Sequence, residues 1–401
     1  MATNPRFDET KRKVAARNAI VLFASMGQKD KMQSEYRTLN TLHPTPEEKA
    51  NADFLVANYD YTQWDSHGND TGTNRQSRLA AEQSLTNFYQ QNRNKPEASK
   101  YALMAAYQIG HMQKTANDPR FRGWFKQVPQ AWEFMKNRGA AKDGKPEALS
   151  PPFVDYAAEA EFTLLDEQIA DQWDKKPDRT KYCGNLEAVL GKYDKAGQRI
   201  KDGAYITDAR QADKYDQALD KIARTYPSVE WTPAAIARQG TIYDGLRTGL
   251  YNTTTAKGSC FTLFSPQQES VLKQMENSGR DNLIDQAGQI RDAAREGWRT
   301  KKESELGGTD AVMVRRYAQA VYLARKYNVR NAFVNKAIAK LAYYTDIIGD
   351  AKMKEYVTAT SDPTDPSKKL DYKDGQFVQS RPGLTSTPAA NGGAVPLPVA
   401  P

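Results

Sequence analysis

The sequence predicts an all-α protein, a solenoid of stacked helical hairpins with a disordered C-terminal tail. Apolar residues recur with the period of an α-helix along most of the chain. No run of alternating β-branched residues and no Asn-Gly turn between strands interrupts that pattern. The last segment is rich in Pro, Gly and Ser and is too poor in large apolar residues to order itself. We therefore predict a flexible N-terminus at residues 1–9, a helical-repeat domain at 10–358 and a disordered tail at 359–401.

The first predicted helix contains the apolar run AIVLFASM, residues 19–26, after the basic segment KRKVAAR. A signal peptide has the same order of regions, but Asp8 and Glu9 precede the basic segment and no A-x-A-like cleavage site follows. We expect an amphipathic helix with a solvated basic face, and any export signal upstream of residue 1. No apolar run approaches the roughly 18 residues that a membrane-spanning helix needs.

Further helices are expected at residues 44–64, with Thr45 as N-cap, and at 74–92, 96–114 and 150–175. The last of these has two apolar stripes, as expected of an inner helix covered from two sides. One stripe holds Phe153, Ala157, Ala160 and Leu164, and the other Ala158, Phe162, Leu165, Ile169 and Trp173. In the second half, helices are expected at 207–227, 231–252, 280–306, 310–328 and 330–350.

The helix at 231–252 has an unusual glycine. Thr232 is its expected N-cap and Pro233 its first residue. Its apolar face contains Ile236, Gly240, Tyr243, Leu246 and Leu250. A glycine inside a helix costs about 1 kcal/mol relative to alanine, so Gly240 is expected to allow close approach of a second helix. It marks either an ordinary core helix or one member of a repeat.

Two short patterns resemble tetratricopeptide repeats, whose first helix favours a large apolar residue, then a small residue, then Tyr three positions later. Ile109-Gly110 matches the first two places, and Gly240 with Tyr243 matches the last two. Gln239 stands where the large apolar residue is usual, and a strict 34-residue spacing does not persist. The resemblance implies degenerate repeats with these four residues at packing positions.

Longer segments resemble a narrower group. FVDYAAEAEFTLLDE, WTPAAIARQGTIYDGL, DAAREGW and YNVRNAFVNKAIAKL are similar to segments of large tetratricopeptide proteins of delta-proteobacterial envelopes, including those of the myxobacterial gliding-motility machinery. The similarity runs from about Tyr101 to Ile348. It implies a non-catalytic scaffold in the periplasm or at the outer membrane. Such proteins are often lipoproteins, although this sequence has no lipobox cysteine.

No constellation for catalysis, cofactor binding or metal binding is found. His43, His67 and His111 are far apart and not in ligand spacing, and there is no P-loop, G-x-G-x-x-G or G-x-S-x-G. The segment at residues 65–72 resembles a calcium loop, but it lacks the alternating acidic ligands and terminal Glu, which favours a surface turn. The acidic candidates for an acid/base pair are Asp155, Glu159, Asp166 and Asp171, for which solvated helix faces are the simpler expectation.

The two cysteines, Cys183 and Cys260, leave two alternatives open. In an exported protein they would pair and close a loop of 77 residues, and otherwise they would be two buried thiols. The net charge of +8, from 57 basic and 49 acidic residues, is spread along the chain rather than concentrated in a stripe.

The leading hypothesis is a non-enzymatic scaffold that binds a protein or peptide in a bacterial envelope or gliding-motility complex, without cofactor, metal or nucleic acid. The alternatives are an envelope enzyme acting on cell-wall polymer and a basic helical-repeat protein that binds nucleic acid. We expect a periplasmic or outer-membrane-associated location, with a cytoplasmic one as the alternative.

Overall fold

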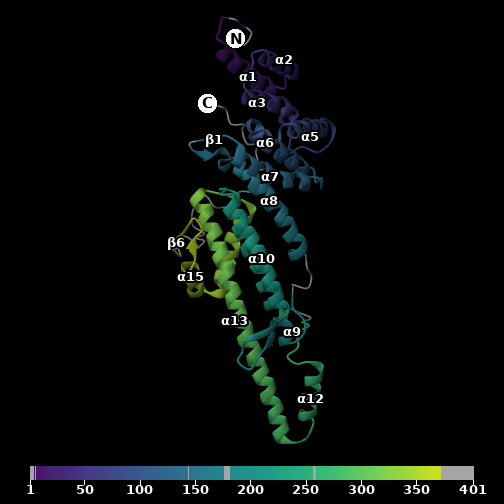
Figure 1. Cartoon of the computed structure of the whole chain (residues 1–401). Helices are drawn as coiled ribbons and strands as arrows, with labels where there is room; N and C mark the ends of the chain where they lie inside the picture. The colour runs from purple at the N-terminus through teal and green to yellow at the C-terminus, as the bar shows by residue number, and fades with distance from the viewer. Residues whose placement is uncertain (1–3, 5, 143, 176–180, 256–258, 372–401) are drawn as a thin grey trace. The chain divides into compact units, whose positions relative to one another are not determined.

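The computed structural model describes residue 4 and residues 6–142, 144–175, 181–255 and 259–371. Within these residues the chain is mostly helical, which confirms the predicted helical class (Figure 1). The chain divides into two compact units, which are described separately below. The first contains the residues up to Leu164 with Tyr226–Ser228, and the second contains Leu165–Thr225 with the described residues from Val229 onward.

The first unit is built from consecutive helices that pack against one another, notably α1 on α2, α5 on α6 and α6 on α7. The elements are α1 (Glu9–Ser25), α2 (Lys29–Asn40), α3 (Pro46–Ala57), α4 (Tyr59–Gln63), α5 (Gly72–Asn92), α6 (Ser99–Thr115), α7 (Phe121–Arg138), the hairpin β1 (Ala141–Lys142) with β2 (Lys145–Pro146), and most of α8 (Phe153–Ile169).

Local sequence explains where helix α3 begins. Thr45 caps α3 as predicted: its hydroxyl accepts the Glu48 amide while the Glu48 carboxylate accepts the Thr45 amide. The predicted 44–64 helix is divided at Asn58 into α3 and α4.

Helix α7 is absent from the elements predicted from the sequence. Pro129 lies inside it, where it removes one backbone donor. The helix nevertheless has a helically spaced buried face, so packing against α6 outweighs the cost of the proline. That face contains Phe121, Phe125, Val128, Trp132 and Met135.

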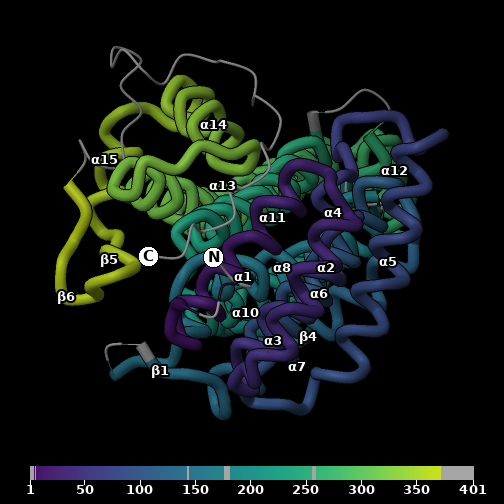
Figure 2. The backbone as a smooth tube through the Cα atoms, turned by 90° about the horizontal axis from the view of Figure 1, so that it is seen from above, coloured from purple at the N-terminus to yellow at the C-terminus, as the bar shows by residue number. Residues whose placement is uncertain are grey.

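In the second unit, α11 (Trp231–Thr255) is the inner helix and contacts α10 (Ala204–Thr225), α13 (Asp281–Tyr327) and α14 (Ala332–Ile348). Residues 233–240 of α11 are all buried, because neighbours cover the helix on several sides. Figure 1 shows α10 alongside α13, to which Tyr205 and Asp216 join it, and Figure 2 shows α13 near α14 and α15. The other elements are a π-helical turn (Ala170–Asp174), α9 (Leu186–Leu190), β3 (Gly191–Tyr193), β4 (Arg199–Asp202), α12 (Pro266–Glu276), α15 (Asp350–Thr358), β5 (Ser361–Asp362) and β6 (Asp365–Lys369).

Two helices predicted at 280–306 and 310–328 are one helix, α13, of 47 residues. Gly307 and Gly308 favour a break, but the next two residues are held firmly against the unit. Thr309 shares a hydrogen bond of 2.5 Å with the Tyr205 hydroxyl, and Asp310 is ion-paired with Arg247. Tertiary contacts on this turn therefore carry the helix through the two glycines.

The predicted tail is ordered at its start, so placing disorder from residue 359 is wrong for residues 359–371. Strands β5 and β6 form an antiparallel hairpin there, one of three two-stranded sheets in the described residues. Side chains of α13 hold it: the Tyr322 hydroxyl donates to Asp362 at 2.6 Å, and the Gln319 amide donates to the Ser361 carbonyl at 3.0 Å. The rest of the predicted tail, residues 372–401, lies outside the described residues.

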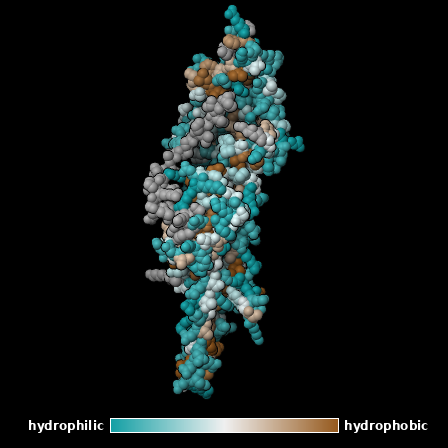
Figure 3. All heavy atoms as spheres, turned by 90° about the vertical axis from the view of Figure 1, so that its left-hand side faces the viewer, coloured by the Kyte–Doolittle hydropathy of each residue, from teal (hydrophilic) through white to brown (hydrophobic). Residues whose placement is uncertain are grey.

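Hydrophilic residues predominate on the face shown in Figure 3, and hydrophobic residues appear there in small separate groups. Among the described helices, none has an apolar stretch long enough to span a membrane.

Candidate functional site

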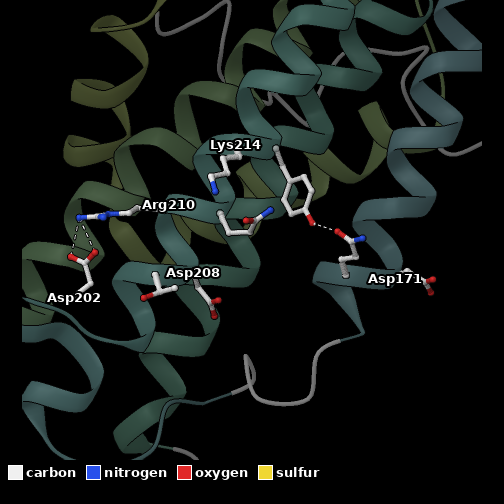
Figure 4. Close-up of a pocket in the computed structure, with 9 residues that line it drawn as sticks. Asp171, Asp202, Asp208, Arg210 and Lys214 are labelled. Atoms are coloured by element: carbon white, nitrogen blue, oxygen red, sulfur yellow. Dashed lines mark hydrogen bonds and ion pairs between the residues drawn. The ribbon is translucent and has the colours of Figure 1, made fainter.

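The second unit has a polar pocket of about 540 Å³ between the start of α10, the π-helical turn and the end of β4 (Figure 4). Helix α10 contributes Thr207, Asp208, Arg210, Gln211, Lys214 and Tyr215, the π-helical turn contributes Asp171 and Gln172, and β4 contributes Asp202. A volume of this size accommodates a small molecule or a few residues of a peptide.

The period of α10 explains why these side chains meet. Most of its pocket residues follow one another at helical spacing, so they share one face of the helix. The other face is apolar and holds the helix on the core through Ile206, Ala212, Leu219 and Ile222. The π-helical turn inserts an extra residue per turn, which changes the direction of the side chains that follow it.

Hydrogen bonds fix the two ends of the pocket. At one end the Tyr215 hydroxyl donates to the Gln172 side chain at 2.9 Å. At the other end, Arg210 forms an ion pair of 2.8 Å with Asp202 (Figure 4). Between them, the Asp208 carboxylate accepts the Tyr182 hydroxyl at 3.2 Å.

Lys214 is an exposed cation of the pocket lining, and no ion pair of its ammonium is found among the described residues. Arg210 and Asp171 are ion-paired, with Asp202 and with Lys175 at 2.7 Å, so the lining combines the Lys214 ammonium with paired charges and with amide and hydroxyl groups. This surface fits a hydrophilic ligand that carries both charges and hydrogen-bonding groups, such as a polypeptide segment, better than an apolar one.

The four acidic residues considered from the sequence do not come together. Asp155 and Glu159 lie in the first unit, whereas Asp166 and Asp171 lie in the second, and only Asp171 lines the pocket. Asp155 accepts the Ser228 hydroxyl at 2.6 Å. Burial, together with the nearby Glu159 carboxylate, raises the pKa of Asp155, while the Ser228 hydrogen bond opposes that rise.

The other acids are held by neighbouring side chains. Glu159 accepts the Tyr107 hydroxyl at 2.6 Å, and Asp166 accepts from buried Arg238 at 2.6 Å. Arg238 also pairs with Asp174 at 2.6 Å, so it ties α8 and the π-helical turn to α11. These carboxylates hold helices together.

The histidines do not form a metal site. His111 lies among aromatic rings, with its ring centroid 5.8 Å from that of Tyr107 and 6.1 Å from that of Trp64. Burial lowers its pKa. His67 lies in an exposed turn, and His43 lies in the loop between α2 and α3 with a positive φ of 50°. Among the described residues, no three His, Cys, Asp or Glu side chains are placed to hold a metal ion.

The segment that resembles a calcium loop is a turn whose carboxylates already have protein partners. Asp65 accepts the His67 amide at 2.8 Å. Asp70 accepts two hydrogen bonds from buried Arg78, at 2.8 and 2.9 Å. This bidentate pair anchors the turn to α5.

The packing residues chosen from the sequence lie at helix–helix contacts. Ile109 is buried, and a Cβ on Gly110 would come within 2.4 Å of the Phe125 ring of α7. A Cβ on Gly240 would come within 2.5 Å of the Tyr317 ring of α13. The ring of Tyr243 is buried, and its hydroxyl donates to Asp213 at 2.8 Å.

Cys183 and Cys260 form a disulfide in the structure. Beside it, the amide of Gly184 donates to the Cys260 carbonyl at 3.1 Å, and the amide of Thr262 donates to the Gly184 carbonyl at 2.9 Å. The bridge thus joins the segment before α9 to the segment before α12.

Apart from Asp171, none of the pocket residues is among the candidates chosen from the sequence. A signal was present, since α10 has a charged and amide-rich face opposite its apolar one. That signal is not specific, because a solvated helix face has the same pattern.

Comparison of the chain with protein-family models, curated proteins and solved structures found no match.

Proposed function

We propose that the chain is a non-catalytic scaffold of a bacterial envelope complex, a degenerate tetratricopeptide-like solenoid that binds a polypeptide partner in the pocket of α10. The observation that carries the proposal is the pairing of helices through small residues, with Gly110 against Phe125 in one unit and Gly240 against Tyr317 in the other. Repeat proteins of stacked helices use such close contacts and present surfaces to partners.

The pocket supports a peptide as the ligand. Backbone amides and carbonyls need hydrogen-bonding partners, which the Gln172, Gln211 and Thr207 side chains offer. Lys214 and Asp208 add one positive and one negative charge that select the side chains of the partner.

The disulfide supports an envelope location. Disulfides persist in oxidising compartments such as the periplasm and are rare in the reducing cytosol. The narrower proposal is that the protein is part of a gliding or other motility assembly. It rests on the resemblance of the sequence segments described above.

This function is tested by measuring which proteins of an envelope extract of the source cells bind to the immobilised chain. The immobilised chain is compared with Arg210→Glu/Lys214→Glu, which reverses the pocket cations. We expect the double variant to lose at least about tenfold in affinity for a partner that the wild type retains, since close charge pairs contribute more than about 1.4 kcal/mol.

Arg224→Glu/Lys221→Glu is a matched control on the same helix. Arg224 is ion-paired with Asp220 at 2.6 Å, as Arg210 is with Asp202, and Lys221 is exposed like Lys214. This control should bind like the wild type. Equal retention of the partner by the pocket variant would contradict the proposed site.

The two alternative functions have direct assays. Release of soluble fragments from purified peptidoglycan would show a cell-wall enzyme. Binding to duplex DNA that weakens steeply with salt would show a nucleic-acid protein. We expect neither.

A further inference from the structure

The β3–β4 hairpin carries lysines in an unfavourable arrangement. Lys192 of β3 lies directly opposite Lys201 of β4 in the antiparallel register. Like charges at such positions destabilise a two-stranded sheet. A ligand that places negative charge beside the ribbon would remove this repulsion.

The neighbouring acids do not neutralise these lysines. Lys192, Lys195 and Lys201 are exposed, and no ion pair of theirs is found in the part of the chain that the structure describes. Asp194 accepts the Gln198 amide at 2.8 Å within the turn, and Asp202 is paired with Arg210.

Helix α13 holds one face of the hairpin. The ammonium of Lys301 lies 3.6 Å from the centre of the Tyr193 ring. Arg199 contacts the Tyr193 hydroxyl at 3.1 Å and pairs with Glu305 of α13. These contacts hold the hairpin on α13 through the face that carries Tyr193 and Arg199, and the paired Lys192 and Lys201 lie on the opposite face.

One apolar side chain of the hairpin is highly exposed. Ile200 is 61% exposed, the largest exposed fraction among the large hydrophobic side chains of the described residues. It is the extra residue of a β-bulge, because the register passes from the Lys192–Lys201 pair to the Tyr193–Arg199 pair. Water solvates the lysines well but not the isoleucine, so the surface fits a partner that offers negative charge and an apolar layer together.

We propose that the β3–β4 hairpin attaches the protein to the surface of an anionic lipid bilayer, with the lysines on the headgroups and Ile200 inserted at the acyl boundary. Juxtamembrane cations and shallow apolar insertion together give reversible membrane binding. A nucleic acid or soluble polyanion would satisfy the lysines but would leave Ile200 in water. The proposal is independent of the α10 pocket.

Vesicle co-sedimentation tests the proposal with the full chain. We expect binding to vesicles of phosphatidylglycerol and phosphatidylcholine, no binding to phosphatidylcholine alone, and loss of binding in high salt. Lys192→Glu/Lys195→Glu/Lys201→Glu should weaken binding by at least about 100-fold, because each lysine near an anionic surface contributes about fivefold and each glutamate adds repulsion. Ile200→Asn should weaken it by about tenfold while leaving the charge unchanged.

Lys273→Glu/Lys354→Glu/Lys368→Glu is the matched control, since these exposed lysines give the same change in net charge elsewhere in the second unit. Circular dichroism of each variant checks that it is folded. If the control loses as much binding as the hairpin variant, the attraction is a property of net charge and the proposal is wrong. The proposal would also be wrong if Ile200→Asn leaves vesicle binding unchanged and the protein binds a DNA duplex equally well.

Discussion

Two glycines, Gly110 and Gly240, set the distance between paired helices at single positions. Each faces an aromatic ring, Phe125 and Tyr317 respectively, that occupies the space where a side chain would begin. Both are buried within α-helices, where glycine is otherwise unfavourable. Packing of the two rings directly against the helix backbone compensates for the unfavourable helix propensity of glycine.

Substitution of Gly240 measures this contact. Gly240→Leu should lower the free energy of unfolding by about 1–3 kcal/mol, since the new side chain must displace the Tyr317 ring. Gly288→Leu is the matched control: a Cβ on Gly288 of α13 would meet no atom within 4 Å, so leucine there should stabilise by about 0.5–1 kcal/mol. Chemical denaturation of both variants gives the comparison, and equal effects would place Gly240 in open space.

The burial of His111 leads us to predict that the free energy of unfolding depends on pH. Burial lowers its pKa, an effect that Lys114 adds to and Glu159 opposes. The folded protein therefore binds the His111 proton less readily than the unfolded chain, whose pKa is about 6.5. The stabilising contribution of the neutral ring is present above that pH and is lost as the pH falls through it.

His111→Phe should therefore lose less stability than the wild type between pH 7 and pH 5. The substitution retains ring packing beside Tyr107 and Trp64, and the Nδ1 atom that it removes has no hydrogen-bond partner among the described residues. His67→Asn, in an exposed turn, is the control and should follow the wild type. Parallel losses in the wild type and His111→Phe would show that His111 does not titrate differently on folding.

At the scale of elements, the ion pair between Arg247 of α11 and Asp310 of α13 holds the long helix at its glycine pair. The two side chains are 2.5 Å apart and nearly buried. Burial raises the pKa of Asp310, and Arg247 opposes that rise. Removing only one partner would leave an uncompensated charge in the core.

We expect Arg247→Met to lower the free energy of unfolding by about 3–5 kcal/mol. Arg247→Met/Asp310→Leu should recover much of that loss, because no buried charge is left unpaired. Denaturation curves of the two single variants and the double variant give the coupling energy. If the double variant is as unstable as the sum of the single variants, the two side chains do not interact.

The elements differ in how far the sequence predicts them. Thr45 and the apolar face from Ile236 to Leu250 are local patterns, and the structure has both a capped α3 and a buried α11 face. The single α13 is different, because Gly307 and Gly308 favour a break and only the partners of Thr309 and Asp310 overcome it. Such partners are about 60 to 100 residues away along the chain, beyond the reach of periodicity.

The sequence does not predict the pocket for a related reason, because its residues come from separate segments of the chain. Its lining comes from the π-helical turn, β4 and α10, and hairpin β3–β4 itself has no Asn-Gly turn to indicate it. Residues such as Lys214 and Asp208 are typical of any solvated helix face. Only their position opposite Gln172 and Asp202 distinguishes them.

At the scale of the whole molecule, the disulfide is the one covalent link between distant parts of the chain in the described residues. It joins Cys183 to Cys260 across 77 residues that include α9, the β3–β4 hairpin, α10 and α11. In the unfolded chain this link closes a long loop and removes many conformations. The β3–β4 hairpin and all pocket residues except Asp171 and Gln172 lie inside the loop, so the stability of both is coupled to the redox state.

Reduction should therefore destabilise the protein by about 4 kcal/mol, the value expected for a loop of this length. We expect dithiothreitol to lower the melting temperature of the wild type and to leave Cys183→Ser/Cys260→Ser, already destabilised, unaffected. Mass spectrometry of non-reduced peptides should recover the Cys183–Cys260 cross-link. Rapid labelling of both thiols in the native, unreduced protein would contradict the bridge, and with it the support that the disulfide gives to an envelope location.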